Sequence, residues 1–198
     1  RRRHTRCSRD WSSDVCSSDL SDRGVQIESL VGSGMMFLKA YTNLIQMKVD
    51  WNYGAQHLSP IPGLVLASRL LFFGSLSFTY ALLASPRLRR DTLAGAWLLM
   101  AGFVTFGYVL SPQYLFWLEP LAIAAASRVE AGWRRSLWLS IFAAAVVLTA
   151  SHFRFYWDYV NLQRFAVTLV LIRNLLLVTH WALSWRWMRP VAAPEARC

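Results

Sequence analysis

Five long apolar blocks constrain this chain more than any other feature of its sequence. The blocks cover roughly residues 63 to 84, 93 to 110, 114 to 127, 137 to 153 and 166 to 185. A run of about 20 apolar residues matches the hydrocarbon thickness of a bilayer, so each block is expected to form a helix in lipid. Hydrophobic residues make up 55% of the chain and charged residues only 16%, and a soluble domain could not bury that much apolar surface. The sequence therefore predicts an all-α, polytopic bundle of about five transmembrane helices whose solvent is the lipid bilayer. The third block is short for a full span and contains Pro120, so a kink is expected there.

Arginine residues mark alternate connections between these blocks. Nine follow the first, third and fifth blocks: Arg87, Arg89, Arg90, Arg128, Arg134, Arg135, Arg186, Arg189 and Arg197. The opposite connections carry only Arg154 and Arg164. This asymmetry predicts that the arginine-rich connections are cytoplasmic and the others extracytoplasmic. The same clustering at span ends explains the basic balance of the chain without a nucleic-acid partner.

The first twenty residues break the pattern. The string RRRHTRCSRDWSSDVCSSDL is polar and has no apolar centre, so it cannot be a signal peptide. One reading frame of a common short-read sequencing adapter encodes it, apart from the index that varies between libraries. We expect residues 1 to 20 to be translated adapter and the chain to be a fragment whose native N-terminal part is missing. The alternative is a disordered basic tail that binds anionic lipid. Without this segment Cys198 is the only cysteine, so neither a disulfide framework nor a metal site is predicted.

The region before the first block has a mixed character. Lys39 and Lys48 interrupt the string MMFLKAYTNLIQMKVDW, which predicts an interfacial helix and an extended loop rather than a sixth span. The arginine pattern places this region outside the cell. The expected organisation is adapter over residues 1–20, extracytoplasmic loop and helix over 21–62, transmembrane bundle over 63–185, and cytoplasmic tail over 186–198.

Two polar strings on the extracytoplasmic side are candidates for chemistry. In DRGVQIES, the Arg23 guanidinium could bind phosphate oxygens in a bidentate fork, and Glu28 could orient Arg23 or bind sugar hydroxyls. The alternative is a solvated loop with a surface ion pair. In SPQY, Pro112 interrupts the helix and frees backbone groups that need polar partners. Alternatively, this string is a tight interhelical turn with Tyr114 as an interfacial anchor.

Several polar side chains fall within the apolar blocks themselves. They are Arg69, Glu119, Arg173, Asn174 and His180. Ionisable groups in a membrane usually face a cavity or a partner, although Arg69 and Arg173 could instead extend toward the headgroups. The sequence contains no Cys/His ligand cluster, glycine-rich phosphate loop or nucleophile elbow, so a metal, a cofactor and soluble hydrolase or kinase chemistry are not expected.

Three strings together carry a resemblance to a known family. DRGVQIES, FGYVLSPQYLFWLEPLA and LIRNLLL resemble the C-terminal half of bacterial membrane glycosyltransferases of family 87. That family is similar to the polyprenol-phosphate-mannose-dependent mannosyltransferases of the GT-C class. The similarity extends over most of residues 22 to 185. Glu119 departs from it, because this position is usually apolar.

The resemblance implies a multi-pass enzyme of the bacterial inner membrane. It would transfer a sugar such as mannose from a polyprenyl-phosphate donor to a hydroxyl of a lipid or glycan acceptor, on the extracytoplasmic face and without a cofactor. The general base would be an acidic residue in an outer loop before this fragment. Residues implied in binding the donor phosphate and sugar are Arg23, Gln26, Glu28, Ser29, Ser111, Gln113 and Tyr114. The competing class is a non-enzymatic membrane protein such as a transporter or flippase-like half.

Overall fold

The computed structural model describes residues 24–42, 45–52, 55–58, 62–85, 91–110 and 113–188. In this part the chain is built mainly of helices, with one antiparallel pair of strands. The adapter expected at residues 1–20, the candidate phosphate ligand Arg23, and Ser111 lie outside the described residues.

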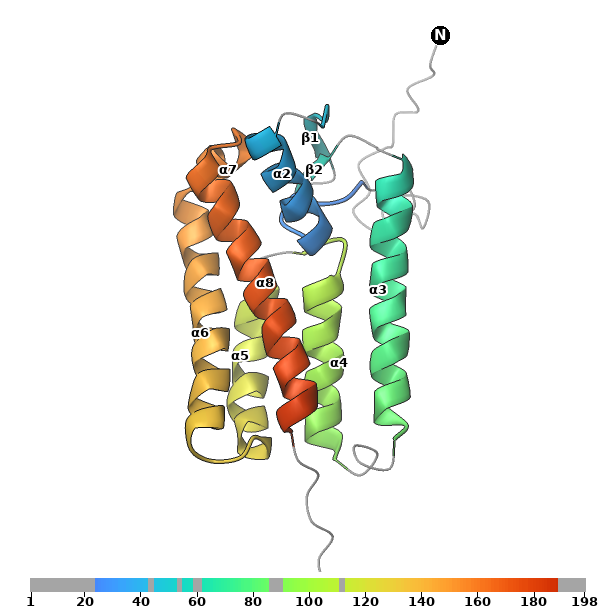
Figure 1. Cartoon of the computed structure of the whole chain (residues 1–198), viewed down its shortest axis with the longest axis vertical. Helices are drawn as coiled ribbons and strands as arrows, with labels where there is room; N and C mark the ends of the chain where they lie inside the picture. Colours follow the sequence, from blue (N-terminus) through green and yellow to red (C-terminus); the bar gives the residue numbers. More distant parts are fainter. Residues whose placement is uncertain are drawn as a thin grey trace, which may run out of the picture.

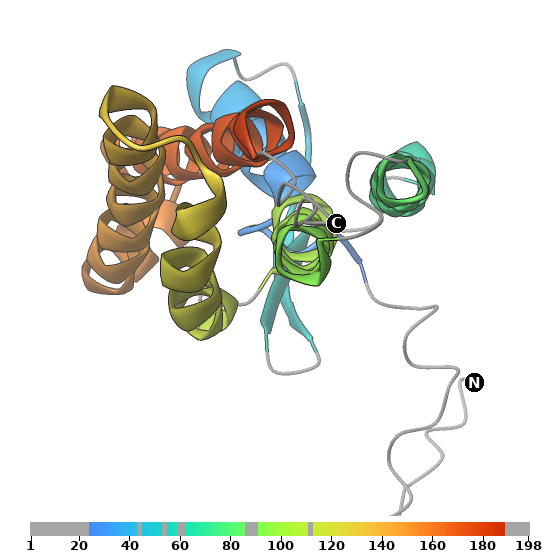
Figure 2. The same ribbon diagram turned by 90° about the horizontal axis from the view of Figure 1, so that it is seen from below.

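Five long helices follow the five apolar blocks and run alternately up and down the bundle (Figure 1). They are α3 (Pro62–Leu83), α4 (Thr92–Phe106), α5 (Gln113–Ala125), α6 (Trp133–Arg154) and α8 (Arg164–Trp187). Figure 2 shows α4 and α8 in the middle, with α3 on one side and α5 and α6 on the other. Among the described residues, three helices (α3, α6 and α8) are long and apolar enough to cross a membrane. The expectation of an all-α membrane bundle is therefore confirmed in outline.

The other two helices of the bundle, α4 and α5, are shorter than the hydrocarbon core of a bilayer is thick. α4 has 15 residues and α5 has 13, with Pro120 inside α5, so at 1.5 Å per residue they are about 22 and 20 Å long. The second block was expected to be helical as far as residue 110, but α4 ends at Phe106. In Figure 1 both helices stop below the upper ends of α6 and α8, and α2 (Leu30–Thr42) lies above them. The upper part of the bundle is therefore filled by a segment that comes before all five helices in the sequence.

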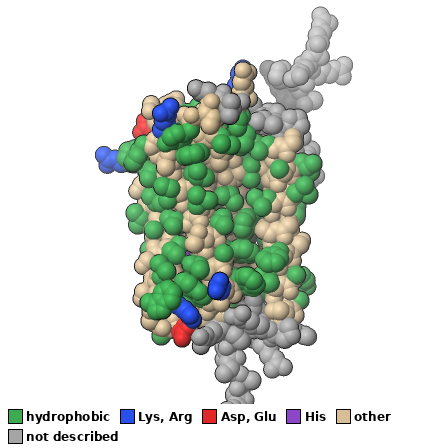
Figure 3. All heavy atoms as spheres, in the orientation of Figure 1, with side chains coloured by type: hydrophobic (Ala, Val, Ile, Leu, Met, Phe, Trp, Pro, Cys, Tyr) green, Lys and Arg blue, Asp and Glu red, His purple; other side chains and the backbone are tan. Residues whose placement is uncertain are grey.

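The connections gather at opposite ends of the bundle. The short helix η1 (Ala126–Arg128) and the end of α8 lie at the lower end in Figure 1, where the arginine-rich connections were expected to meet. The upper end carries α2, the sheet and α7 (Tyr156–Val160). Figure 3 shows hydrophobic side chains over the flank between the two ends, with charged side chains toward the ends. Large apolar residues of α3, such as Leu70 and Phe73, are exposed, as expected of a surface in contact with lipid.

A short hairpin replaces part of the extended loop that the sequence predicts between α2 and α3. Strands β1 (Val49–Asn52) and β2 (Ala55–Leu58) pair antiparallel, with Val49 opposite Leu58. Strand β2 is the buried strand of the hairpin, because Gln56, His57 and Leu58 are covered, whereas Asp50 and Trp51 of β1 are exposed. The loop prediction was wrong here, because Val49 to Asn52 alternates apolar and polar residues as a strand does.

Candidate functional site: a buried polar cluster around Glu28

The backbone of the site is the non-helical segment 24–29, which comes just before α2. This segment lies beside β2, because the Ile27 amide donates to the Gln56 carbonyl at 3.2 Å and the Leu58 amide donates to the Val25 carbonyl at 2.9 Å. Glu28 is only 5% exposed. The alternative of a solvated loop with a surface ion pair is therefore wrong for this part of the string.

Side chains of α8 hold the carbonyl groups of this segment. Arg173 Nη2 donates to the Glu28 carbonyl oxygen at 2.6 Å, and Asn174 Nδ2 donates to the same oxygen at 3.1 Å. Asn174 Nδ2 also lies 3.2 Å from the Ser29 carbonyl oxygen and 2.7 Å from Ser33 Oγ. Backbone that is not helical can be buried at membrane depth only where protein groups satisfy it. Arg173 and Asn174 therefore allow an irregular segment to sit inside the bundle.

The short helix α7 supports the same segment from above. The Tyr159 hydroxyl donates to the Ile27 carbonyl oxygen, and its ring is fully buried. Burial raises the pKa of Tyr159 above its ordinary value. Burial and the nearby Glu28 carboxylate raise the pKa of Tyr156 to about 12. Both tyrosines are therefore neutral hydrogen-bonding groups at physiological pH.

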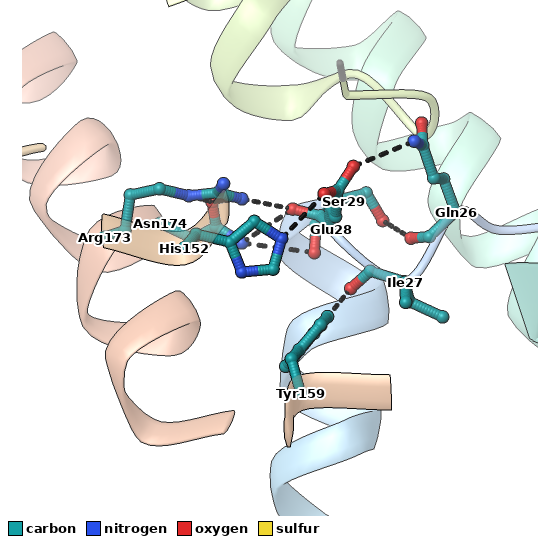
Figure 4. Close-up of polar contacts among 8 residues, drawn as sticks. All are labelled: Gln26, Ile27, Glu28, Ser29, His152, Tyr159, Arg173 and Asn174. Atoms are coloured by element: carbon teal, nitrogen blue, oxygen red, sulfur yellow. Dashed lines mark hydrogen bonds and ion pairs between the residues drawn. The ribbon is translucent and has the colours of Figure 1, made fainter. Parts of the chain in front are cut away.

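The Glu28 carboxylate has a partner on each of its oxygens (Figure 4). His152 Nε2 lies 2.7 Å from Oε1, and Gln26 Nε2 donates to Oε2 at 3.0 Å. Because carboxylate oxygens only accept, the nitrogen of the Gln26 amide must face Glu28. His152 comes from the end of α6 and is 2% exposed. Helix α6 and the 24–29 segment thus fix the carboxylate in one orientation.

Arg173 is fully buried, with 0% of its surface exposed. Its Nε and Nη2 atoms lie 3.2 and 3.0 Å from Asn174 Oδ1. The alternative that this side chain extends toward the headgroups is therefore wrong. A buried guanidinium in a membrane protein is energetically expensive, and it usually has a functional or structural partner.

The start of α2 requires a glycine close to this cluster. The Ser29 hydroxyl donates to the Gln26 carbonyl oxygen and accepts from the Gly32 amide at 3.1 Å, which caps the helix. A Cβ atom at position 32 would lie 2.1 Å from the Gln26 carbonyl oxygen. Only glycine allows α2 to turn back so closely against the segment.

The remaining candidate residues lie elsewhere. Gln113 is exposed at the first position of α5, and Tyr114 packs against the core of the lower bundle with its ring 5.3 Å from that of Trp117. No hydrogen bond between described residues joins either side chain to segment 24–29. Near the second polar string, the Gln26 amide instead donates to the carbonyl of Tyr108, three residues before SPQY, at 3.1 Å. The structure therefore brings Gln26, Glu28 and Ser29 together but not Gln113 and Tyr114.

Three members of the cluster were not singled out from the sequence. His152, Tyr156 and Tyr159 lie in an aromatic stretch at the upper end of α6 and in α7. The only sequence signal was a histidine close to a span end. Arg173 and Asn174 were noted as polar residues within a span, but nothing in the sequence connected them to Glu28.

Neither metal-ligand geometry among the described residues nor comparison with known proteins assigns a chemistry to this cluster. Within the described part of the chain, no group of three or more His, Cys, Asp or Glu side chains could hold a metal ion. Comparison with protein-family models, with curated proteins and with solved structures finds no match. The arrangement itself offers a fixed carboxylate, an imidazole, a guanidinium and an amide, which together suit hydroxyl groups and anions.

Proposed function

We propose that this chain is the C-terminal part of a membrane glycosyltransferase of the GT-C class in the bacterial inner membrane. In this proposal it transfers a sugar, such as mannose, from a polyprenyl-phosphate donor to a lipid or glycan acceptor on the extracytoplasmic face. The five long helices are then five spans, with the arginine-rich end in the cytoplasm and the Glu28-centred cluster near the outer face.

One observation supports this proposal above the others. The three strings that carry the resemblance are far apart in the sequence, yet each contributes to the same place. Gln26 of the first string bonds to Tyr108 of the second, and Glu28 of the first bonds to Arg173 and Asn174 of the third. A shared functional site is a direct reason for groups from three strings that are far apart in the sequence to meet inside an apolar bundle.

The proposal gives each part of the site a role in the reaction. As the donor's phosphate leaves, negative charge grows on it, and a fixed cation such as Arg23 stabilises that charge. Glu28 accepts hydrogen bonds from sugar hydroxyls, while Gln26 and Ser29 shape its surroundings. The general base that deprotonates the acceptor is not assigned to a residue of this chain.

The test is sugar transfer by the full-length protein in membranes, with a radiolabelled polyprenyl-phosphate mannose as donor. Glu28→Gln keeps the size of the side chain but removes its charge, and we expect transfer to fall on the order of 10²-fold. Glu119→Gln, also within the helical bundle, is the matched control and should retain activity. Thermal stability of both variants is measured in detergent to separate folding from catalysis. If a folded Glu28→Gln variant transferred sugar at the wild-type rate, Glu28 would have no role in the proposed site.

A transporter or flippase-like function is the second candidate, because ionisable groups buried among helices also occur in transporters. Uptake of labelled polyprenyl-phosphate sugar into sealed proteoliposomes, without product formation, would favour it over transfer.

A further inference from the structure

Two polar atoms of the Glu28-centred cluster have no hydrogen-bond partner among the described residues. They are Arg173 Nη1 and Gln26 Oε1. The two residues are 0% and 6% exposed, so bulk water does not satisfy these atoms. An unsatisfied buried polar group is destabilising, and more so when it carries charge. Such atoms in a folded protein therefore call for a partner.

The cluster itself cannot supply that partner. The Gln26 amide cannot rotate to exchange its atoms, because its nitrogen must donate to Glu28 Oε2. The carboxylate of Glu28 is already paired with His152, and Arg173 bonds instead to the Glu28 carbonyl. No ion pair of Arg173 is found in the part of the chain that the structure describes. One free donor with a positive charge and one free acceptor thus remain, flanking Glu28 from either side (Figure 4).

We propose that these two atoms recognise a phosphorylated sugar, with a phosphate oxygen accepting from Arg173 Nη1 and a sugar hydroxyl donating to Gln26 Oε1. A phosphate group meets the need of a buried guanidinium for an anion. A hydroxyl supplies the hydrogen that the amide oxygen requires, which a chloride ion or a carboxylate would not. Both atoms are covered in this structure, so binding has to displace the side chains over them.

This inference deepens the proposed function and rests on it for the choice of ligand. It assigns the phosphate to Arg173 in the last span, in addition to the role proposed for Arg23, and separates phosphate recognition from sugar recognition. The two parts can then be tested independently of each other.

The first experiment needs no variant. Binding to the full-length protein in lipid nanodiscs is measured by tryptophan fluorescence for a short-chain polyprenyl-phosphate mannose, the same polyprenyl phosphate without sugar, the free polyprenol, and mannose 1-phosphate. We expect affinity to fall in the order sugar phosphate lipid, phosphate lipid, polyprenol. Mannose 1-phosphate shows whether the phosphorylated sugar must be linked to a lipid. Equal affinity for polyprenyl phosphate and polyprenol would overturn the proposal.

Two substitutions then test the contributions of Arg173 Nη1 and Gln26 Oε1 separately. Arg173→Lys keeps the charge but shortens the reach, and it should weaken both phosphate-bearing lipids about tenfold or more, as expected for loss of one charged hydrogen bond. Gln26→Met should weaken the mannose-bearing lipid and leave polyprenyl phosphate unchanged. Arg164→Lys is the control, because Arg164 is an exposed arginine at the start of the same helix.

The outcomes distinguish this site from the proposed function. Binding that depends on Arg173 and Gln26, without transfer to any acceptor, would support the site and contradict the glycosyltransferase. Transfer with unchanged affinities in both folded variants would support the enzyme and overturn the site. If Arg173→Lys does not fold, as judged by circular dichroism, the wild-type comparison and Gln26→Met decide.

Discussion

The bundle contains two cores that handle buried polar groups in different ways. The lower core lies among α4, α5, α6 and α8, and the upper core lies among segment 24–29, α2, β2, α7 and the start of α8. In the lower core the buried main chain belongs mainly to helices and their caps, with Leu110 in the connection after α4 as an exception, so the backbone largely satisfies itself. In the upper core the buried main chain includes an irregular stretch, and side chains from distant helices have to satisfy it.

The lower core shows how little polar chemistry a helical interior needs. The indole nitrogens of Trp97 and Trp138 both donate to Ser184 Oγ at 2.9 Å. The Ser184 hydroxyl donates in turn to the His180 carbonyl within its own helix at 2.7 Å. Trp181 Nε1 also donates to the Leu98 carbonyl at 3.2 Å. Most of the remaining contacts are aromatic and aliphatic packing, including the His180 ring against Trp138 with centroids 4.2 Å apart.

The upper core depends on particular donors. Replacing a leucine by another apolar residue of similar volume perturbs a packed interior only mildly, but a carbonyl oxygen accepts only from a donor at the right place. The comparison teaches that Arg173, Asn174 and Tyr159 are much less replaceable than their apolar neighbours in the same helices.

The largest expected effect is a difference in cysteine labelling between the two ends of the bundle, because a cysteine is either accessible or inaccessible from one side of a sealed vesicle. Single cysteines are placed at Ser85, at the lower end, and at Asn161, at the upper end, in a cysteine-free background. An impermeant maleimide should label them from opposite sides of sealed vesicles, with Ser85 on the cytoplasmic side. Labelling of both from the same side would contradict the five-span arrangement.

Loss of a donor should destabilise the upper core strongly. Asn174→Leu keeps the branched shape of the side chain but leaves the Ser29 carbonyl and the Ser33 hydroxyl without this partner, and we expect the free energy of unfolding to fall by about 2–4 kcal/mol. Unfolding in mixed detergent micelles measures the change. Asn161→Leu, on the exposed loop after α7, should change stability by less than roughly 0.5 kcal/mol. Equal effects of the two substitutions would show that the upper core does not depend on these bonds.

A smaller loss is expected in the lower core. Ser184→Ala removes the shared acceptor of Trp97 and Trp138, while the helical backbone keeps its own bonds. The expected loss in unfolding free energy is about 1–2 kcal/mol, measured in the same micelles. A loss greater than that of Asn174→Leu would reverse the comparison between the two cores.

The smallest effect is confined to alkaline pH. In the folded chain Tyr156 has a pKa of about 12, whereas an unfolded tyrosine titrates near about 10. The folded state therefore holds this proton more tightly, so the stabilisation is complete below pH 10 and is lost as the pH rises toward 12. Tyrosinate absorbance and unfolding, followed together, should show the upper core loosening in this window. Tyr156→Phe should reduce that pH dependence, and an unchanged profile would exclude Tyr156 as its source.

Much of the helical framework could be predicted from the sequence, because length and hydropathy directly reflect the thickness of the bilayer. The blocks at 137 to 153 and 166 to 185 lie within α6 and α8. The third block is already short in the sequence, and α5 is correspondingly short although it continues through Pro120 to Ala125. The end of α4 was misplaced, since the apolar string FGYVL continues past the point where Gly107 leaves the helix.

The site was less predictable, because its contacts join residues far apart in the chain. DRGVQIES and LIRN could each be noted as unusual, yet hydrophobic periodicity says nothing about which polar groups pair. His152 was overlooked because a single histidine near a span end has no distinctive spacing. The glycosyltransferase activity and the roles of Arg23 and Ser111 remain predictions.

The residues of the Glu28-centred cluster are far apart along the chain, so they are synthesised at different times. Glu28 is separated by 124 residues from His152 and by 145 from Arg173. When segment 24–29 leaves the ribosome, the α7 and α8 side chains that later donate to its carbonyl groups have not been synthesised, so these carbonyl groups must stay hydrated until then. It can enter the bundle only after α6 and α8 have been inserted and have packed together. Segment 24–29 is therefore made before the five long helices but reaches its final position after them.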